Sequence, residues 1–168
     1  QPWLLAKASK EDLREFNYFY QDIAGGTLPD ALDLLPETFD DPSLDKEYER
    51  YGFKRNRLIF SLKEDGIQRA LIVVNLADIT LNLSELTSAI QVFVFEPEML
   101  PRSVLDLILS LLCCKTERKM APVLLYPDKY AEVNELPLEK KYNLFIFNTD
   151  YLDHYFRHLE SLIRTVNH

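Results

Sequence analysis

Residues 53–75 read FKRNRLIFSLKEDGIQRALIVVN, and this stretch decides the fold because it predicts a β-hairpin. Its first half places Leu58, Phe60 and Leu62 on one side of a strand at 53–63. The sequence at 64–66, Glu-Asp-Gly, is typical of a tight hairpin turn. Residues 67–75 then return with an unbroken apolar run at 70–74, as expected for a strand covered on both faces. The stretch therefore predicts two antiparallel strands inside a sheet that has a layer on each side.

The hydrophobic spacing of the remaining chain predicts helices and further strands around this hairpin. The predicted elements are, in chain order, a strand at 3–8, a helix at 11–23 capped by Ser9, a helix at 28–35, one or two helical turns at 44–50, the hairpin, a strand at 88–95, a helix at 102–117, a strand at 122–126, a short helix at 129–135, a strand at 142–147 and a helix at 150–164. The helix at 102–117 has little polar face, so we expect it to be heavily buried. The order predicts an α/β (α+β) fold with antiparallel strands in the middle and helical crossovers later.

Composition limits the class of protein. The chain has 168 residues, of which 47% are hydrophobic, which predicts one globular domain spanning residues 1–168. A net charge of −8 disfavours nucleic-acid binding, and no run approaches the roughly 18 apolar residues needed to cross a membrane. The two cysteines, Cys113 and Cys114, are adjacent and cannot form a disulfide framework, so we expect a reducing, cytoplasmic location. The chain starts at Gln1 without a signal-type stretch, and we expect a fragment of a larger, bacterial-type protein.

The element order resembles the GNAT fold of the N-acetyltransferase superfamily over nearly the whole chain. Tyr48 and the sequence Tyr51-Gly52-Phe53 are similar to a Tyr-and-Gly-Phe phrase of that family, where the phrase usually follows the fifth strand. The resemblance implies a mixed central sheet with an antiparallel meander, flanked by helices. The early position of the phrase leaves an alternative, in which one GNAT half ends near residue 60 and a second begins at 67.

The resemblance also implies a place for an acyl donor. In the family, the fourth and fifth strands part to admit the pantetheine arm, and a helix N-terminus faces the pyrophosphate. The preceding loop usually reads Gln/Arg-x-x-Gly-x-Gly/Ala, because glycine lets the backbone approach the phosphates. Residues 96–103 of this chain read EPEMLPRS, without glycine and with two prolines and two carboxylates. The resemblance thus leaves Phe95, Arg102 and Ser103 as cofactor-facing positions and implies that coenzyme A binding is lost or much weakened.

Two residues are candidates for acid–base chemistry by the same resemblance. Glu96 follows the strand at 88–95, where such enzymes often hold the general base that deprotonates an amine. Tyr130 follows the strand at 122–126 and is a candidate for the acid that protonates the departing thiolate. The structural alternatives are a surface carboxylate at a strand end for Glu96 and a packed core tyrosine for Tyr130.

Two further groups of residues have a ligand-binding interpretation. Lys54, Arg55 and Arg57 form the densest basic group, which would hold a phosphate or an acidic partner, or else form a solvent-facing strand surface. His154 and His158 are four residues apart on the last predicted helix, but no third ligand accompanies them. We therefore interpret the histidines as part of a solvated helix face and predict no metal site.

These observations favour a GNAT-like domain that has lost or altered acyl-CoA binding and acts as a regulatory or protein-interaction module. Its partners would be other domains of a parent protein or a separate protein, and no cofactor is expected. The alternative is an active N-acyltransferase that uses an acyl-CoA or another acyl donor, with Glu96 as general base. A third hypothesis is a homodimer formed through an edge strand.

Overall fold

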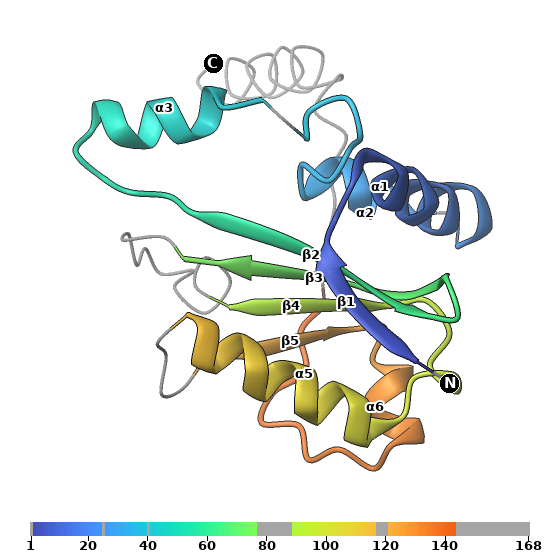
Figure 1. Cartoon of the computed structure of the whole chain (residues 1–168). Helices are drawn as coiled ribbons and strands as arrows, with labels where there is room; N and C mark the ends of the chain where they lie inside the picture. The colour runs from blue at the N-terminus through green and yellow to red at the C-terminus, as the bar shows by residue number, and fades with distance from the viewer. Residues whose placement is uncertain (1, 25, 40, 77–88, 117–120, 144–168) are drawn as a thin grey trace, which may run out of the picture.

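The computed structural model describes residues 2–24, 26–39, 41–76, 89–116 and 121–143. Its sheet has five strands in the order β1-β2-β3-β4-β5 (Figure 1). They are β1 (Trp3–Lys7), β2 (Arg57–Glu64), β3 (Ile67–Asn75), β4 (Ile90–Val94) and β5 (Val123–Tyr126). The first three pairings are antiparallel, and the last, between β4 and β5, is parallel. The predicted GNAT-like mixed sheet, an antiparallel meander followed by a helical crossover, is therefore confirmed.

Helices cover both faces of this sheet (Figure 1). The helices are α1 (Lys10–Asn17), the π-helix η1 (Tyr18–Ile23), α2 (Leu28–Ala31), α3 (Ser43–Arg50), α5 (Arg102–Lys115) and α6 (Lys129–Val133). Along β3, Leu71 and Val73 pack under α1, η1 and α2, whereas Ile72 and Val74 pack under α5 and α6. All four side chains are fully buried. The apolar run in β3 is therefore continuous because each face of the strand has its own core.

The start of α1 is fixed by the predicted cap. Ser9 and Asp12 form a capping box, in which the Ser9 hydroxyl accepts from the Asp12 amide and the Asp12 carboxylate accepts from the Ser9 amide. The single helix predicted at 11–23 is wrong in one respect, because its second half is the separate π-helix η1.

The helix predicted at 28–35 is wrong in length, since α2 ends at Ala31. Asp33 adopts a left-handed conformation with φ 53°, which a helix does not continue through. Arg57 donates to the carbonyl oxygens of Leu32 and Asp33, at 2.6 and 3.0 Å, so a residue of β2 satisfies the end of this helix. The end of α2 is thus stabilised by the Arg57 side chain, which lies far away in the sequence.

The expectation that the 102–117 helix is heavily buried is also wrong in part. Leu105, Ile108 and Leu112 of α5 are buried against the sheet. Leu107 and Leu111, one turn apart, have exposed fractions of 61% and 53%. Only one stripe of a helix can face a sheet, so the apolar residues outside that stripe stay uncovered within the described part of the chain.

The β2–β3 turn offers a direct test of the hairpin. Asp65 and Gly66 both have positive φ, 50° and 85°, as the tight turn requires. A Cβ added at Gly66 meets nothing within 4 Å, so Gly66→Ala is opposed by backbone conformation alone. We expect Gly66→Ala to lower the free energy of unfolding by about 1–2 kcal/mol, and Gly66→Asn to lower it less, because Asn tolerates this region. Chemical denaturation of the two variants checks this order, and equal losses would contradict it.

The predicted strand at 53–63 begins only at Arg57, because residues 53–56 lie outside the ladder. β2 and β3, which the paired-halves alternative assigns to different halves, are adjacent strands of one sheet. Residues 144–147 and the helix predicted at 150–164 lie outside the described residues. Within the part that is described, no helix is both long and apolar enough to span a membrane.

Candidate functional site

The parallel pairing of β4 with β5 ends near the carboxyl ends of both strands, where the resemblance locates the acyl donor. The strands pair in parallel as far as Phe93 and Tyr126. The chain after Phe93 continues along β3, since the Phe95 amide donates to the Arg69 carbonyl oxygen at 3.0 Å. The chain after Tyr126 reaches Pro127, which has no amide to donate. The end of this parallel pairing is the centre of the candidate site.

Aromatic rings pack together at the end of the β4–β5 pairing, on the face of the sheet that α1 and η1 cover. Phe93 and Tyr126 are stacked, with ring centroids 5.0 Å apart and planes at 19°. Phe95 stacks on Phe19 of η1 at 4.9 Å and 12°. Phe16 of α1 packs edge-on against Phe93 at 5.2 Å. Packed side chains of the protein therefore cover this face of the sheet at the end of the β4–β5 pairing.

The turn between β4 and α5 is built on packed apolar residues. Pro97 and Leu100 are buried, and Leu100 belongs to the core between the sheet and α5. The Met99 amide donates to the Glu96 carbonyl oxygen at 2.9 Å, which closes the turn locally. Pro97 and Pro101 contribute no amide donors. The turn is thus anchored by its side chains and offers fewer backbone donors than a glycine-rich loop.

The cations around the turn are matched with carboxylates. Arg69 pairs with Glu96 at 2.8 Å, Lys129 with Glu98 at 2.5 Å and Arg102 with Asp106 at 3.4 Å. The hydrogen bond from Lys129 holds the pKa of Glu98 below its usual value, so Glu98 is ionised at neutral pH. An incoming phosphate would meet these carboxylates as well as the cations.

Glu96, the candidate general base, is joined to a buried arginine. The Arg69 side chain is only 10% exposed and also contacts Glu64, at 3.2 Å, whereas the Glu96 side chain is 55% exposed. To accept a proton from an amine, the Glu96 carboxylate would use either the oxygen that Arg69 already contacts or its second oxygen. Its catalytic assignment stays a prediction.

Tyr130, the candidate acid, is fully buried under α5. Its hydroxyl is buried and has no hydrogen-bond partner among the residues that the structure describes, Glu96 included. Burial, and then the charge of Asp106, raise the pKa of Tyr130 to about 12, which keeps the hydroxyl protonated at neutral pH. Protonation suits an acid, but the fully buried position is that of a packed core tyrosine. Its catalytic role also remains a prediction.

The three predicted cofactor-facing residues do not gather at one surface. Arg102 and Ser103 lie exposed in the first turn of α5. Phe95 lies with the aromatic rings on the opposite face of the sheet. These residues remain candidates, but the structure does not bring Phe95 together with the other two.

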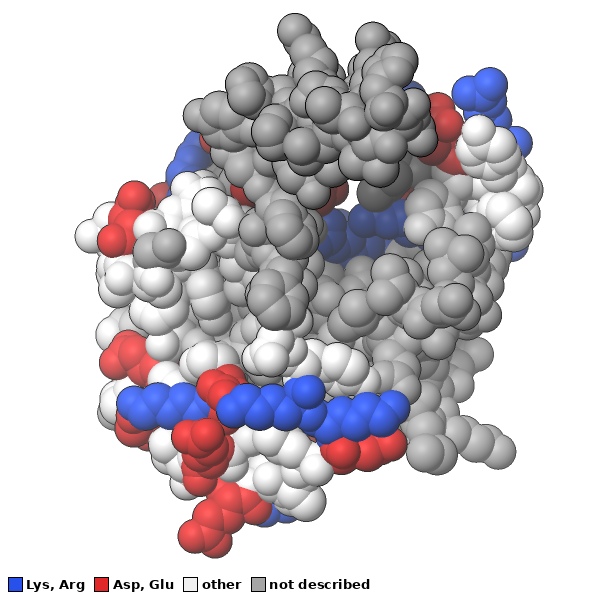
Figure 2. Space-filling model, turned by 180° about the vertical axis from the view of Figure 1, so that it is seen from behind, with Lys and Arg blue, Asp and Glu red and all other residues white. Residues whose placement is uncertain are grey.

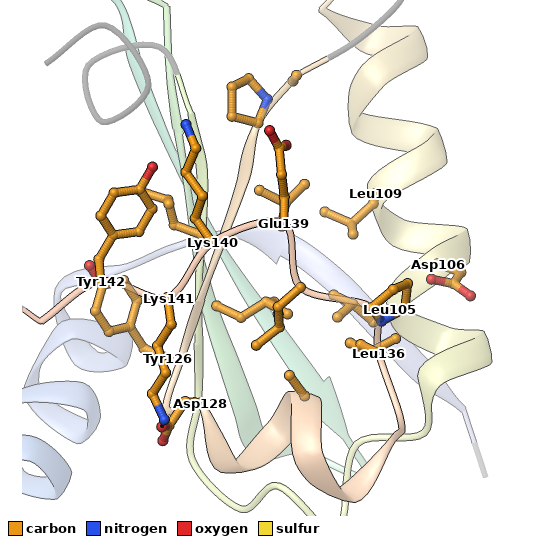
Figure 3. A pocket seen from close by; sticks show the side chains of 18 of the residues that line it. Leu105, Asp106, Leu109, Tyr126, Asp128, Leu136, Glu139, Lys140, Lys141 and Tyr142 are labelled. Carbon is orange, nitrogen blue, oxygen red and sulfur yellow. Dashed lines mark ion pairs between the residues drawn. The ribbon is translucent and has the colours of Figure 1, made fainter. Parts of the chain in front are cut away.

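A cavity that sequence reasoning missed lies beside β5 (Figure 3). It measures about 650 Å³ and is bounded by α5, β5 and the chain at 136–143. Leu105, Leu109 and Leu136 line its apolar part, whereas Lys141 turns away to pair with Asp128. The one sequence signal for this arrangement is Pro137, which interrupts the predicted elements before residues 138–143 return beside β5.

The described residues contain no group of three or more His, Cys, Asp or Glu side chains placed to hold a metal ion. His154 and His158 lie outside them.

Comparison with solved structures finds several similar chains. The chain is similar to the crystal structure of ribosomal-protein-alanine N-acetyltransferase from Brucella melitensis biovar Abortus 2308, with a TM-score of 0.45 and 14% sequence identity. The similarity covers 88% of this chain and 99% of that one. No protein-family model and no curated protein matches the sequence.

Proposed function

We propose that this GNAT-like domain does not bind acyl-CoA through the β4–α5 turn and that it acts as a regulatory or protein-interaction module. The observation that carries the proposal is the turn itself. Pro97 and Leu100 anchor it in the core, and Glu96 and Glu98 place two carboxylates beside the start of α5. A diphosphate needs backbone amides at close approach and an excess of positive charge, and this turn supplies little of either.

The aromatic cluster supports the same proposal from the other face of the sheet. The rings of Phe93, Tyr126, Phe95 and Phe19 stack in pairs where the pairing of β4 with β5 ends. A pantetheine arm entering there would have to displace packed side chains, at the free-energy cost of opening a close-packed core.

An interaction role is supported by apolar exposure on α5. Leu107 and Leu111 lie one turn apart and are more than half exposed. Apolar side chains exposed next to one another are a feature of surfaces that contact another protein or domain. The partner is expected to be another domain of a parent protein, a separate protein or a second copy of the chain.

Isothermal titration of the domain with coenzyme A and acetyl-CoA tests the proposal. We expect no binding in the micromolar range and no acetyl transfer to amine acceptors, because the turn lacks donors for the diphosphate. Circular dichroism of the same sample confirms that the protein is folded. Micromolar binding with turnover would contradict the proposal. If Glu96→Gln then abolished turnover, the alternative of an active N-acyltransferase would take its place.

A further inference from the structure

The basic group singled out in the sequence lies partly inside the molecule. Arg55 and Arg57 line a cavity of about 160 Å³ together with Lys7, Thr38 and three aspartates. Their side chains are only 17% and 13% exposed. The interpretation as a solvent-facing strand surface is therefore wrong for both arginines, although Lys54 is exposed. On the face seen from behind, Lys and Arg side chains are visible inside a hollow (Figure 2).

Arg55 has a close ion pair with Asp45, whereas Arg57 is only partly neutralised. Arg57 donates to two neutral acceptors, the carbonyl oxygens of Leu32 and Asp33, and its contact with the Asp33 carboxylate is a long one at 3.6 Å. Burial and then the charge of Arg55 lower the pKa of Arg57 to about 10, against the opposing effect of Asp33 and Asp45. The Asp33 and Asp45 carboxylates thus compensate incompletely for the buried charge of Arg57, and an anion bound beside Arg57 would improve this balance.

The aspartates of the cavity lie nearer to solvent than the arginines. The side chains of Asp33 and Asp45 are 50% and 46% exposed. Asp41 accepts from the amide and hydroxyl of Ser43 at 2.9 and 3.0 Å, which engages it at the start of α3. Asp45 pairs with Arg55 at 2.5 Å. The carboxylates therefore form an outer part of the cavity, and the guanidinium groups form an inner part.

We propose that this cavity binds a phosphate group, presented by inorganic phosphate or by a small phosphate monoester. Arg55 and Arg57 supply planar donor groups, and Lys7 lines the same space. Lys7 lies on β1, Arg57 on β2 and Arg55 just before β2, so the three side chains can donate to a tetrahedral dianion from different directions. A carboxylate is planar and carries one negative charge, so it accepts fewer of these hydrogen bonds. The cavity is well below the roughly 300 Å³ at which pockets for drug-sized ligands begin, so it fits a phosphate group and excludes a whole nucleotide.

The test uses the full chain at constant ionic strength. Phosphate, methyl phosphate and acetate are each titrated against a sodium chloride reference, with binding followed by amide chemical shifts in NMR spectra. We expect saturable shifts with phosphate or methyl phosphate, and weaker binding of acetate. Tighter binding of methyl phosphate identifies a monoester as the ligand, and tighter binding of phosphate identifies the free ion. Equal responses to phosphate and chloride, or preference for acetate, would overturn the proposal.

Matched variants locate the site. Arg55→Gln removes one charge-assisted donor from the cavity and is expected to weaken phosphate binding about tenfold. Arg50→Gln removes the same group from α3, where the side chain is 72% exposed, and is expected to change binding less than about twofold. Lys7→Gln is the second cavity variant, should Arg55→Gln prove unfolded by circular dichroism. Unchanged affinity in a folded cavity variant would refute the site. None of these measurements depends on coenzyme A, so the proposed function can fail without affecting this result.

Discussion

Phe93→Ala is expected to lower the free energy of unfolding by about 3–5 kcal/mol, the usual loss when a buried aromatic side chain is truncated. Phe93 is fully buried at the centre of the aromatic cluster, where Tyr126 stacks on it and Phe16 packs edge-on at 5.2 Å. The truncation leaves a cavity between β4, β5 and α1, so both burial and ring contacts are lost. Urea denaturation followed by circular dichroism measures the change.

Tyr18→Ala is the matched control for this prediction. Tyr18 is an aromatic residue of η1 that is 61% exposed, and its truncation is expected to change stability by less than about 0.5 kcal/mol. If Phe93→Ala lost no more than Tyr18→Ala, the end of the β4–β5 pairing would not be covered by tightly packed rings. That result would also remove one of the two supports for the absence of acyl-CoA binding.

Asp12→Ala is the second large effect, with an expected loss of about 2–4 kcal/mol at neutral pH. Asp12 is 4% exposed, and one of its oxygens accepts from the amide and hydroxyl of Ser9, both at 2.7 Å. Its other oxygen pairs with Lys63 of β2 at 2.7 Å. The substitution thus removes the cap of α1 and leaves Lys63 unpaired. Glu11→Ala, in the same helical turn but 69% exposed, is expected to lose less than about 0.5 kcal/mol.

The contribution of Asp12 should depend on pH in a defined direction. Burial acts to raise the pKa of Asp12, but the hydrogen bonds from Lys63 and Ser9 outweigh it and hold the pKa below the ordinary value of 3.8. A lowered pKa means that the stabilisation is complete above that value and is lost as the pH falls through the folded-state pKa. The hydrogen bond to Asp12 raises the pKa of Lys63 above the usual lysine value of 10.5. The stabilisation from this pair is therefore also lost at alkaline pH, as the pH rises through the raised pKa of Lys63.

Denaturation at several pH values checks this dependence. The difference in unfolding free energy between the native chain and Asp12→Ala should be constant near neutrality and should narrow below about pH 4. A difference that stays the same from neutral pH to pH 3 would show that Asp12 acts through packing alone.

Local chemistry allowed much of the fold to be predicted from the sequence. The Asp65-Gly66 turn, the capping box at Ser9 and the unbroken apolar run in β3 each depend on neighbouring residues, and each prediction of structure from them is confirmed. The length of α2 could not be predicted in this way. It depends on Arg57, whose guanidinium group reaches the carbonyl oxygens at the helix end from another element.

The candidate site was less predictable than the fold because its properties are tertiary. The composition of the β4–α5 turn is visible in the sequence, but the Arg69–Glu96 pair and the ring stacks join residues from separate elements. The same holds for Arg55 and Arg57, because the sequence shows them as a basic group but does not show that residues of the loop after α2 line a cavity with them. The exposure of Leu107 and Leu111 was missed because an apolar helix sequence does not reveal how much of its surface the sheet can cover.

The most direct test of the central claim observes the β4–α5 turn itself while acetyl-CoA is added. In amide NMR spectra of the labelled domain, Arg102, Ser103 and Val104 report on the first turn of α5, separately from phosphate binding near Arg55. The Arg55→Gln variant, measured in parallel, weakens binding at that second site. We predict that these three amides show no saturable shift with acetyl-CoA in either protein. Saturable shifts of the same amides with micromolar affinity would contradict the account.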